Sequence, residues 1–347
     1  MKALETISWD ETTSSILLID QTKLPLSYQI IRCRTVNRLI TAIRRLEVRG
    51  APALGVAGAY GVALAAMTIR ERDFHRYFHL VESAALDIGK ARPTAVNLSW
   101  GVLRVLARIR QARSVEEVRI LAVSEAKKVA DEDAAACHAI GSHGAALLPE
   151  TGTVLTHCNA GALACREWGT ALGVIRSAVE SGKNISVIAC ETRPLLQGAR
   201  LTAWELKRDA IPVTVIPDSA AAHLMRRKEI DCVIVGADRI TRDAVFNKIG
   251  TYMHAICAGS HDIPFFVAAP TSTFDRVHAE EDIEIEERER DEVAHFSGHA
   301  TVPDDVPVRN PAFDATPLSL VSALITEEGV IRPASDWVKI AGKHRVI

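Results

Sequence analysis

The chain has 347 residues, of which 48% are hydrophobic, and its formal net charge is −2. This composition is typical of a globular, soluble protein, and the near-neutral charge gives no electrostatic reason to expect nucleic acid or an anionic membrane as a partner. The length predicts two domains, because single cores rarely grow beyond about 250–300 residues.

The amino-terminal segment has no apolar run of signal-peptide length. One uncharged stretch, 51–69, approaches the length of a membrane span, but it is rich in alanine and glycine, so we interpret it as a helix buried in protein. The seven cysteines form no C-x-x-C pair, and the twelve histidines show no metal-ligand spacing. We therefore expect a cytoplasmic protein with no disulfide framework and no bound metal.

Residues 1–147 are predicted to form a mainly helical domain with a small antiparallel sheet. Two β-like runs come first, at 15–20 and 26–34, and helical patterns follow at 36–46, 52–69, 74–90, 95–111 and 115–147. Ser114 precedes Glu116 and Glu117, which is the pattern of a helix N-cap followed by an acidic first turn.

Residues 148–347 have a different pattern, in which short β-branched runs alternate with helical segments. Strands are predicted at 153–157, 185–190, 213–217, 231–236 and 264–269, and helices at 170–181, 197–208 and 220–228. Apolar strands that alternate with helices predict a parallel sheet covered on both faces, so this domain is expected to be doubly wound α/β. The charged run 280–293 is predicted to be a solvated surface segment.

Polar side chains follow several of the predicted strands. Ligands of open parallel sheets bind beyond the carboxyl ends of the strands, so these side chains predict a polar pocket at that edge. They are Cys158, Glu191, Thr192, Arg193, Asp218, Ser219, Asp238 and Thr271. Plainer interpretations stay open, with Asp218 as a helix N-cap, Glu191 and Arg193 as an ion pair, and Cys158 as a buried thiol.

Asp238 is the strongest candidate for an acid. It follows the apolar run "VIVGA", and desolvation there would raise the pKa of its carboxyl and keep it protonated near neutral pH. Cys158 lies between a strand and a run of small residues, "NAGALA", where a ligand could approach the sulfur.

Four short motifs are candidates for binding an anionic group. "RGAPALG" places Arg49 and Gly50 before a helix with Pro52 near its first turn, where backbone N–H groups attract anions. "NKIGTY" suggests Asn247 and Lys248 at the start of another helix, "ARPT" places Arg92 in a turn at Pro93, and "LLQGARLTA" offers Gln197 at a helix start. The chain has no P-loop, and the spacing of Gly55, Gly58 and Gly61 is not that of a dinucleotide site, so no nicotinamide cofactor is expected.

These motifs, with "RPTAVNLSWG", "THCNAGALA", "ETRPLLQGARLTAWEL", "GADRI" and "APTSTFD", resemble those of the methylthioribose-1-phosphate isomerase family, from about Arg49 to Pro333. The resemblance implies a cofactor-free conversion of 5-methylthioribose 1-phosphate to 5-methylthioribulose 1-phosphate in methionine salvage. It also implies a homodimer whose chain joins a helical amino-terminal domain to a Rossmann-like carboxyl-terminal one. By matching motifs, it implies that Cys158 and Asp238 are catalytic and that the sugar phosphate is bound by Arg49, Gly50, Ala51, Arg92, Gln197, Asn247 and Lys248.

Two alternatives stay open. An isomerase of ribose 1,5-bisphosphate or 5-deoxyribose 1-phosphate would share the catalytic pair, and the loop after Asp238, shorter and poorer in glycine than expected, leaves the C5 substituent undecided. A non-catalytic binding module, related to regulatory subunits of the exchange factor for eukaryotic translation initiation, would share the fold but is expected to lack Cys158 and Asp238.

The reaction itself suggests a role for each catalytic residue. Phosphate on the anomeric oxygen prevents ordinary ring opening, so an acid must protonate the ring oxygen, and this role falls to Asp238. Hydrogen then moves from C2 to C1 either through a base or as hydride, and Cys158 acts as that base or stabilises positive charge at C1. The sequence does not choose between the two routes.

Overall fold

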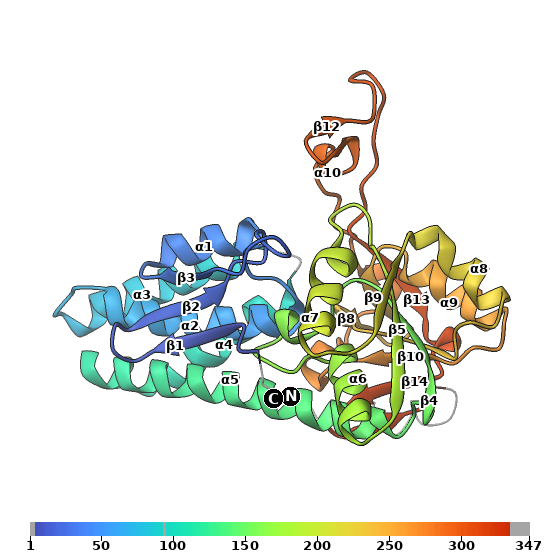
Figure 1. Ribbon diagram of the computed structural model, residues 1–347. Coiled ribbons are helices and arrows are strands. Elements are labelled where there is room, and N and C mark those ends of the chain that lie inside the picture. The colour runs from blue at the N-terminus through green and yellow to red at the C-terminus, as the bar shows by residue number, and fades with distance from the viewer. Residues whose placement is uncertain (1–3, 93–94, 334–347) are drawn as a thin grey trace. The chain divides into compact units, whose positions relative to one another are not determined.

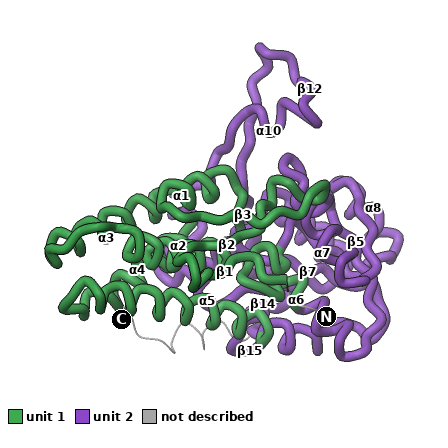
Figure 2. Tube along the Cα trace, turned by 60° about the vertical axis from the view of Figure 1, so that its left-hand side comes forward, with its two compact units in different colours: residues 1–139, 160–173 green, residues 140–159, 174–347 purple. Residues whose placement is uncertain are grey.

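The computed structural model of the protein describes residues 4–92 and 95–333 (Figure 1). The chain divides into two compact units, residues 1–139 with 160–173 and residues 140–159 with 174–347 (Figure 2). We expected one division, between residues 147 and 148. The units differ from this because Gly144 packs against Val174 and Ile325 in the second unit, while Ala164 lies against Gly50 in the first. Of the "ARPT" turn, Pro93 and Thr94 lie outside the described residues.

The first unit combines a small antiparallel sheet with helices, as predicted. The sheet has the order β1-β2-β3, and its strands are β1 (Ile7–Asp10), β2 (Ser15–Ile19) and β3 (Ile30–Cys33). The helices are α1 (Val36–Arg44), α2 (Ala51–Thr68), α3 (Phe74–Gly89), α4 (Val96–Ile109) and α5 (Val115–Ala145), followed by the short turn η1 (Ala162–Ala164). The N-cap prediction for α5 is confirmed, since Ser114 Oγ accepts a hydrogen bond from the Glu117 N–H at 3.1 Å.

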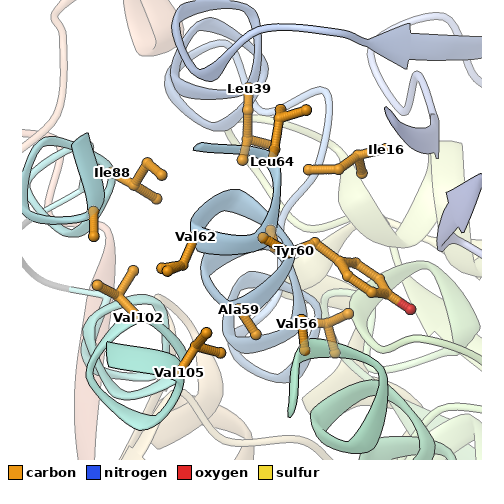
Figure 3. Close-up of a cluster of buried hydrophobic side chains, with 14 of the residues drawn as sticks. Ile16, Leu39, Val56, Ala59, Tyr60, Val62, Leu64, Ile88, Val102 and Val105 are labelled. Atoms are coloured by element: carbon orange, nitrogen blue, oxygen red, sulfur yellow. The ribbon is translucent and has the colours of Figure 1, made fainter. Parts of the chain in front are cut away.

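Helix α2 lies at the centre of the first unit's core. Figure 3 shows its side chains pointing in several directions, toward residues of β2, α1, α3 and α4; those drawn include Val56, Tyr60, Val62, Leu64, Ile16, Leu39, Ile88, Val102 and Val105. Among the described residues, α2 is the one helix long and apolar enough to cross a membrane, yet 78% of that stretch is buried within the structure. This burial agrees with the interpretation of 51–69 as a core helix.

The second unit contains a seven-stranded sheet of order β15-β14-β10-β7-β4-β5-β6. Its strands are β4 (Thr151–Thr156), β5 (Asn184–Cys190), β6 (Val213–Ile216), β7 (Cys232–Val235), β10 (Phe265–Ala268), β14 (Ala323–Thr326) and β15 (Gly329–Ile331). Neighbouring strands pair in parallel except for β15, which is antiparallel to β14. When the strands are renumbered 1 to 7 in chain order, from β4 to β15, the sheet reads 3-2-1-4-5-6-7 from β6 to β15. The chain adds β5 and β6 on one side of β4 and then adds β7 on the other side, so the strand order reverses between β4 and β7. This is the strand order of doubly wound dinucleotide-binding sheets.

Helices flank this sheet on both sides in Figure 1. They are α6 (Ala171–Glu180), the π-helical turn η2 (Gly198–Thr202) that continues into α7 (Ala203–Arg208), the turn η3 (Asp218–Ala220) with α8 (Ala221–Arg226), and α9 (Thr251–Gly259). Met225 of α8 and Ala255 of α9 pack with Val233 and Val235 of β7 in one apolar cluster.

Two smaller elements complete the second unit. The strands β8 (Arg239–Ile240), β9 (Ala244–Lys248) and β13 (Phe313–Pro317) form a second sheet of order β13-β9-β8. An arm projects from the unit in Figure 1 and contains α10 (Asp291–Ala294), β11 (His295–Phe296) and β12 (His299–Ala300). Much of the charged run 280–293 belongs to this arm and to the turn η5 (Glu280–Asp282) before it. The last short turns are η4 (Thr271–Thr273) and η6 (Leu318–Leu320).

Candidate active site

Cys158 and Asp238 leave the large sheet from adjacent strands. Cys158 follows β4 by two residues and Asp238 follows β7 by three, and the two strands pair in parallel with Leu155 opposite Val233. The order of the sheet reverses between these strands, and the crevice outside the carboxyl ends at such a reversal is where open α/β sheets bind ligands. The structure therefore places both candidate catalytic residues at this edge of the second unit.

The backbone of Cys158 is in the left-handed region, with φ of 62°. Its N–H donates to Thr192 Oγ1 at 2.8 Å, and its carbonyl oxygen accepts from Thr202 Oγ1 at 2.7 Å. The next residue, Asn159, donates from Nδ2 to Glu205 Oε1 at 2.9 Å. The thiol-bearing loop is thus held by side chains from the loop after β5 and from the η2–α7 helix.

His157, directly before Cys158, forms a buried pair with His254 of α9. His254 Nε2 and His157 Nδ1 are 3.2 Å apart, and His157 Nε2 lies 2.8 Å from the Ile249 carbonyl oxygen. Since that carbonyl requires a donor, Nε2 of His157 carries the proton and Nδ1 accepts from His254. Burial lowers the pKa of His157 to about 4 and the pKa of His254 to about 3, so both rings are neutral at physiological pH. The pair joins the end of β4 to the turn that follows Lys248.

Asp238 lies in the short connection between β7 and a β-hairpin. Its N–H donates to the Phe246 carbonyl oxygen at 2.9 Å, and strands β8 and β9 follow as an antiparallel pair. Arg239 pairs with Asp275, at 3.6 Å, and the turn is closed by a hydrogen bond from Thr241 Oγ1 to Asp243 Oδ1 at 2.9 Å. Asp238 is thereby positioned next to the strand that carries Asn247.

Asn247 and Lys248 are on strand β9, so the expectation that they begin a helix is wrong. Helix α9 starts only at Thr251, because Gly250, with φ of 101°, turns the chain between strand and helix. Asn247 Nδ2 donates to Thr251 Oγ1 at 3.0 Å. Lys248 Nζ donates to the Ala312 carbonyl oxygen at 2.7 Å and lies 4.8 Å from the centroid of the Phe313 ring.

Asp314 is an acidic neighbour of Asn247 that the sequence patterns did not indicate. The two residues are directly opposite each other in the pairing of β13 with β9. The Asp314 carboxylate accepts the N–H groups of Gly250 at 2.7 Å and Tyr252 at 3.1 Å, at the start of α9. Burial nevertheless raises the pKa of Asp314 to about 6. A second carboxyl group thus lies on the sheet that carries Asn247 and Lys248.

Gln197 lies directly before the π-helical turn η2, in the segment that follows β5. Strand β5 is the neighbour of β4, the strand that leads to Cys158. The side chain is buried, with 4% exposure, and its Oε1 has no hydrogen-bond partner among the described residues. Gly198 permits close packing here, because a Cβ would lie 1.7 Å from the Cys190 carbonyl oxygen. An unpaired buried acceptor is costly, so Gln197 is well suited to receive a hydrogen bond from a ligand hydroxyl.

Asp218 and Arg193 differ from their expected roles. The Asp218 carboxylate does not cap a helix but accepts the N–H groups of Thr192 and Arg193, at 2.8 and 2.7 Å. Arg193 donates to the carbonyl oxygens of Pro194 and Val293, and its guanidinium lies over Phe296 of the arm. These contacts stabilise the loop after β5 and link it to the arm.

The remaining predicted binding residues belong to the first unit. Gly50, with φ of 92°, is the N-cap of α2, and Ala51 is its first residue. Arg49 Nε donates to Gln21 Oε1 at 3.1 Å, and Gln21 Nε2 donates to the Leu163 carbonyl oxygen at 2.7 Å. A guanidinium beside the amino end of a long helix is a favourable place for an anion. Arg92 lies in the turn after α3, where its carbonyl oxygen accepts from the Ala95 N–H.

Within residues 4–92 and 95–333, two groups of side chains could ligate a metal ion, and the sequence spacing did not indicate them. They are His157, Cys190 and His254, and Asp133, Cys137 and Cys165; within each group the donor atoms lie within 4.8 Å of one another. Burial raises the pKa of Cys190, and a hydrogen bond with Cys165 together with burial raises the pKa of Cys137. Both thiols are therefore protonated in the metal-free protein, and the lack of a metal cofactor stays a prediction.

Fold and site together define a two-unit α/β protein with a cysteine and an aspartate at the strand-order reversal of its parallel sheet. A family model described as the initiation factor 2 subunit family matches residues 47–333. The chain is 53% identical to the methylthioribose-1-phosphate isomerase of Heliobacterium modesticaldum, over 95% of this chain and 96% of that protein.

Solved structures agree with the family match. The 5-methylthioribose 1-phosphate isomerase of Pyrococcus horikoshii is 40% identical with a TM-score of 0.90, over 97% of this chain and 95% of that one. The structure of a protein named translation initiation factor eIF-2B, subunit delta, from A. fulgidus is 52% identical with a TM-score of 0.88, over 98% of this chain and all of that one. The chain belongs to the initiation factor 2 subunit family, and the resemblance to methylthioribose-1-phosphate isomerases predicted from its motifs is confirmed.

Proposed function

We propose that the protein is an aldose–ketose isomerase that converts 5-methylthioribose 1-phosphate to 5-methylthioribulose 1-phosphate, a step of methionine salvage. The observation that carries this proposal is the full-length similarity to proteins named for that reaction, at about half of all positions. The positions of Cys158 and Asp238 at adjacent strand ends support it, because a sugar-sized ligand needs reacting groups that emerge at one edge of the sheet.

Asp238 acts as the acid in this proposal. Its proton goes to the ring oxygen, the C1–O bond to that oxygen breaks, and the ring opens with phosphate still on the anomeric oxygen. Hydrogen then moves from C2 to C1 and leaves a ketone at C2. Cys158 either takes the C2 proton as a thiolate and returns it to C1, or stabilises the cation at C1 while hydride migrates. In both routes the C2 hydroxyl loses its proton as the ketone forms, and the Asp238 carboxylate takes that proton, which restores the acid. Solvent deuterium in the product at C1 indicates the first route, and full retention of the C2 hydrogen indicates the second.

The proposal divides the substrate-binding residues into those that bind the phosphate and those that bind the sugar. Arg49, Gly50, Ala51 and Arg92 are proposed to bind the phosphate group, which the amino end of α2 favours. Gln197, Asn247 and Lys248 are proposed to bind the sugar, and the unpaired Oε1 of Gln197 supports its part in this. The reaction is an internal rearrangement, and no cofactor is proposed.

The direct test replaces Asp238 by asparagine, which keeps the side chain's shape and removes the acid. We expect Asp238→Asn to lower kcat by about three orders of magnitude or more, since proton transfer to the ring oxygen is lost. Binding of the sugar phosphate, measured by calorimetry, should stay within about threefold, because the neutral amide fills the same space. Turnover near that of the wild type would contradict the assignment of Asp238.

The same assay should compare three substrates. 5-Methylthio-, 5-deoxy- and 5-phosphoribose 1-phosphate differ only in the substituent at C5. The substrate with the largest kcat/KM therefore identifies the C5 substituent that the site prefers, and we expect this to be the methylthio group. Failure of purified wild-type protein to convert any of them would favour the alternative of a non-catalytic binding module; the similar A. fulgidus protein is named as a subunit of a translation initiation factor.

We also propose a cytoplasmic homodimer. All seven cysteines are free thiols, which is the usual state in a reducing compartment. The homodimer follows from family resemblance.

A further inference from the structure

Cys158 adopts a backbone conformation that its side chain does not favour. Its φ is 62°, a left-handed conformation in which the Cβ of a non-glycine residue crowds the backbone. Such a residue persists only when its surroundings hold it in place. The side chains that hold it therefore control where the thiol points.

Two threonine hydroxyls bind the two backbone polar groups of Cys158. Thr192 Oγ1 accepts from the Cys158 N–H at 2.8 Å and lies 3.1 Å from the Cys190 carbonyl oxygen, to which it donates. Thr202 Oγ1 donates to the Cys158 carbonyl oxygen at 2.7 Å and accepts from Asn159 Nδ2 at 3.2 Å. Each hydroxyl thus gives its one proton and accepts one hydrogen bond, and both threonines have 0% exposure.

An acid supports each threonine, directly at Thr192 and through Asn159 at Thr202. The Asp218 carboxylate accepts the Thr192 N–H at 2.8 Å, and Thr192 also has a positive φ, of 66°. On the other side, Glu205 accepts from Asn159 at 2.9 Å and from Arg176 at 2.8 Å, with both Glu205 and Arg176 buried. Thr202 is the last residue of the π-helical turn η2, and π-bulges of this kind often occur at functional sites.

We propose that Thr192 and Thr202 are positioning residues that clamp the Cys158 peptide in the left-handed region and so direct its thiol at the substrate. The hydroxyls do not touch the sugar in this proposal; they act through Cys158. The proposal rests on the proposed function only for the part in which Cys158 takes part in isomerisation. It gives a positioning role to Thr192, which the sequence placed only among the polar residues at the strand ends, and to Thr202, for which the sequence predicted no role.

The test uses isosteric and conservative variants at both positions. Thr192→Val and Thr202→Val remove a hydroxyl but keep the shape, whereas Thr192→Ser and Thr202→Ser keep the hydroxyl. We expect each valine variant to lower kcat by about 10- to 100-fold with KM within about threefold, because a small misplacement of a reacting group has effects of that size. The serine variants should recover kcat to within about threefold, and the double valine variant should be little worse than either single one, because both act on one residue.

Thr326→Val serves as the matched control. Thr326 is buried, donates to the Gly329 carbonyl oxygen at 3.0 Å and accepts from the Glu328 N–H at 3.2 Å, at the end of β14. Loss of the Thr326 hydroxyl should lower the melting temperature as much as Thr192→Val and Thr202→Val do, but it should leave kcat unchanged. An equal loss of kcat in all three valine variants would show a general effect of stability and would overturn the proposal.

A second measurement does not depend on turnover. The rate of iodoacetamide modification is followed by mass spectrometry at Cys158 and at Cys257, a half-buried thiol of α9 that serves as an internal control. In the valine variants the Cys158 rate should change by at least about fivefold and the Cys257 rate should not. An unchanged Cys158 rate in the valine variants would refute the clamp. If the Cys158 rate changes in these variants but the wild-type protein has no isomerase activity, only the proposed function is refuted.

Discussion

At the scale of single residues, the strain at Cys158 leads to a prediction about stability. Glycine adopts a φ near +60° without cost, whereas alanine does not. We expect Cys158→Gly to be more stable than Cys158→Ala by about 1 kcal/mol in urea unfolding, although glycine usually destabilises an ordered chain. Both variants should be inactive. Equal stabilities, or a more stable alanine variant, would mean that the Cys158 backbone is not held in the left-handed region.

The neutral histidine pair predicts how stability depends on pH. The pKa values of His157 and His254 lie at about 4 and about 3 in the folded protein, below the ordinary value of 6.5. The unfolded chain therefore binds more protons at these groups below pH 6.5, so their contribution to the free energy of unfolding is complete above pH 6.5 and is lost as pH falls toward 4. Asp314 acts in the opposite direction, because its folded pKa of about 6 is raised and it favours the folded state as pH falls below 6.

A single variant isolates the histidine effect. His254→Gln keeps an N–H donor for His157 but does not titrate in this range. Between pH 7 and 5, its free energy of unfolding should fall by about 2 kcal/mol less than that of the wild type. Parallel pH profiles for the two proteins would show that His254 is not buried as a neutral ring.

Local sequence identifies some site residues and not others. Cys158 and Asp238 are recognisable because they follow apolar strands, which is a property of the chain itself. Thr192, Thr202 and His254 hold the site through hydrogen bonds that join segments 34 to 97 residues apart, and no local pattern reveals such bonds. The motif "NKIGTY" predicted a helix start at Asn247 and Lys248, but both residues end β9, and α9 begins at Thr251 with Gly250 as its N-cap.

At the scale of elements, the close contact of α2 with α4 predicts that replacing a glycine of α4 by alanine destabilises the protein. A Cβ on Gly101 would lie 2.0 Å from the Gly55 carbonyl oxygen, so the two helix backbones touch there. We expect Gly101→Ala to lower the free energy of unfolding by about 1–3 kcal/mol, although alanine favours helices over glycine by about 1 kcal/mol. Gly89→Ala is the control, because its nearest neighbour would be Ser99 Oγ at an ordinary 3.6 Å. A harmless Gly101→Ala would contradict the close packing.

Helices and central strands are predictable because their signals are long or strongly apolar. The five helical runs of the first unit correspond to α1 to α5, and the five strands predicted in the second unit correspond to β4, β5, β6, β7 and β10. The strands that were not predicted are all short, between two and five residues; they are β1, β8, β9, β11, β12, β13, β14 and β15. A pattern of so few residues does not distinguish a strand from a loop.

At the scale of the whole molecule, strand order lies beyond what sequence patterns predict. The alternation of strands and helices indicates a doubly wound sheet, but the return of β7 to the far side of β4 is a property of packing. The division into two units also differs from the expected one, because residues 160–173 fold with the first unit through contacts such as that of Ala164 with Gly50. Turn signals near residue 147 mark the end of α5 and not a domain boundary.

The proposed homodimer is tested by mass in solution. Light scattering coupled to gel filtration should give twice the 37.7 kDa of one chain at micromolar concentration. A mass of one chain over that range would contradict the proposal and leave the isomerase activity to be explained by a monomer.

The central claim is that Cys158 and Asp238 act on one sugar phosphate at the reversal between β4 and β7. The most direct measurement is a crystal structure of the protein with the reaction product, 5-methylthioribulose 1-phosphate. The account predicts the Cys158 sulfur within about 3.5 Å of C1 or C2 and the Asp238 carboxyl at the oxygen released from the ring. A product molecule bound elsewhere, or in contact with only one of the two side chains, would contradict it.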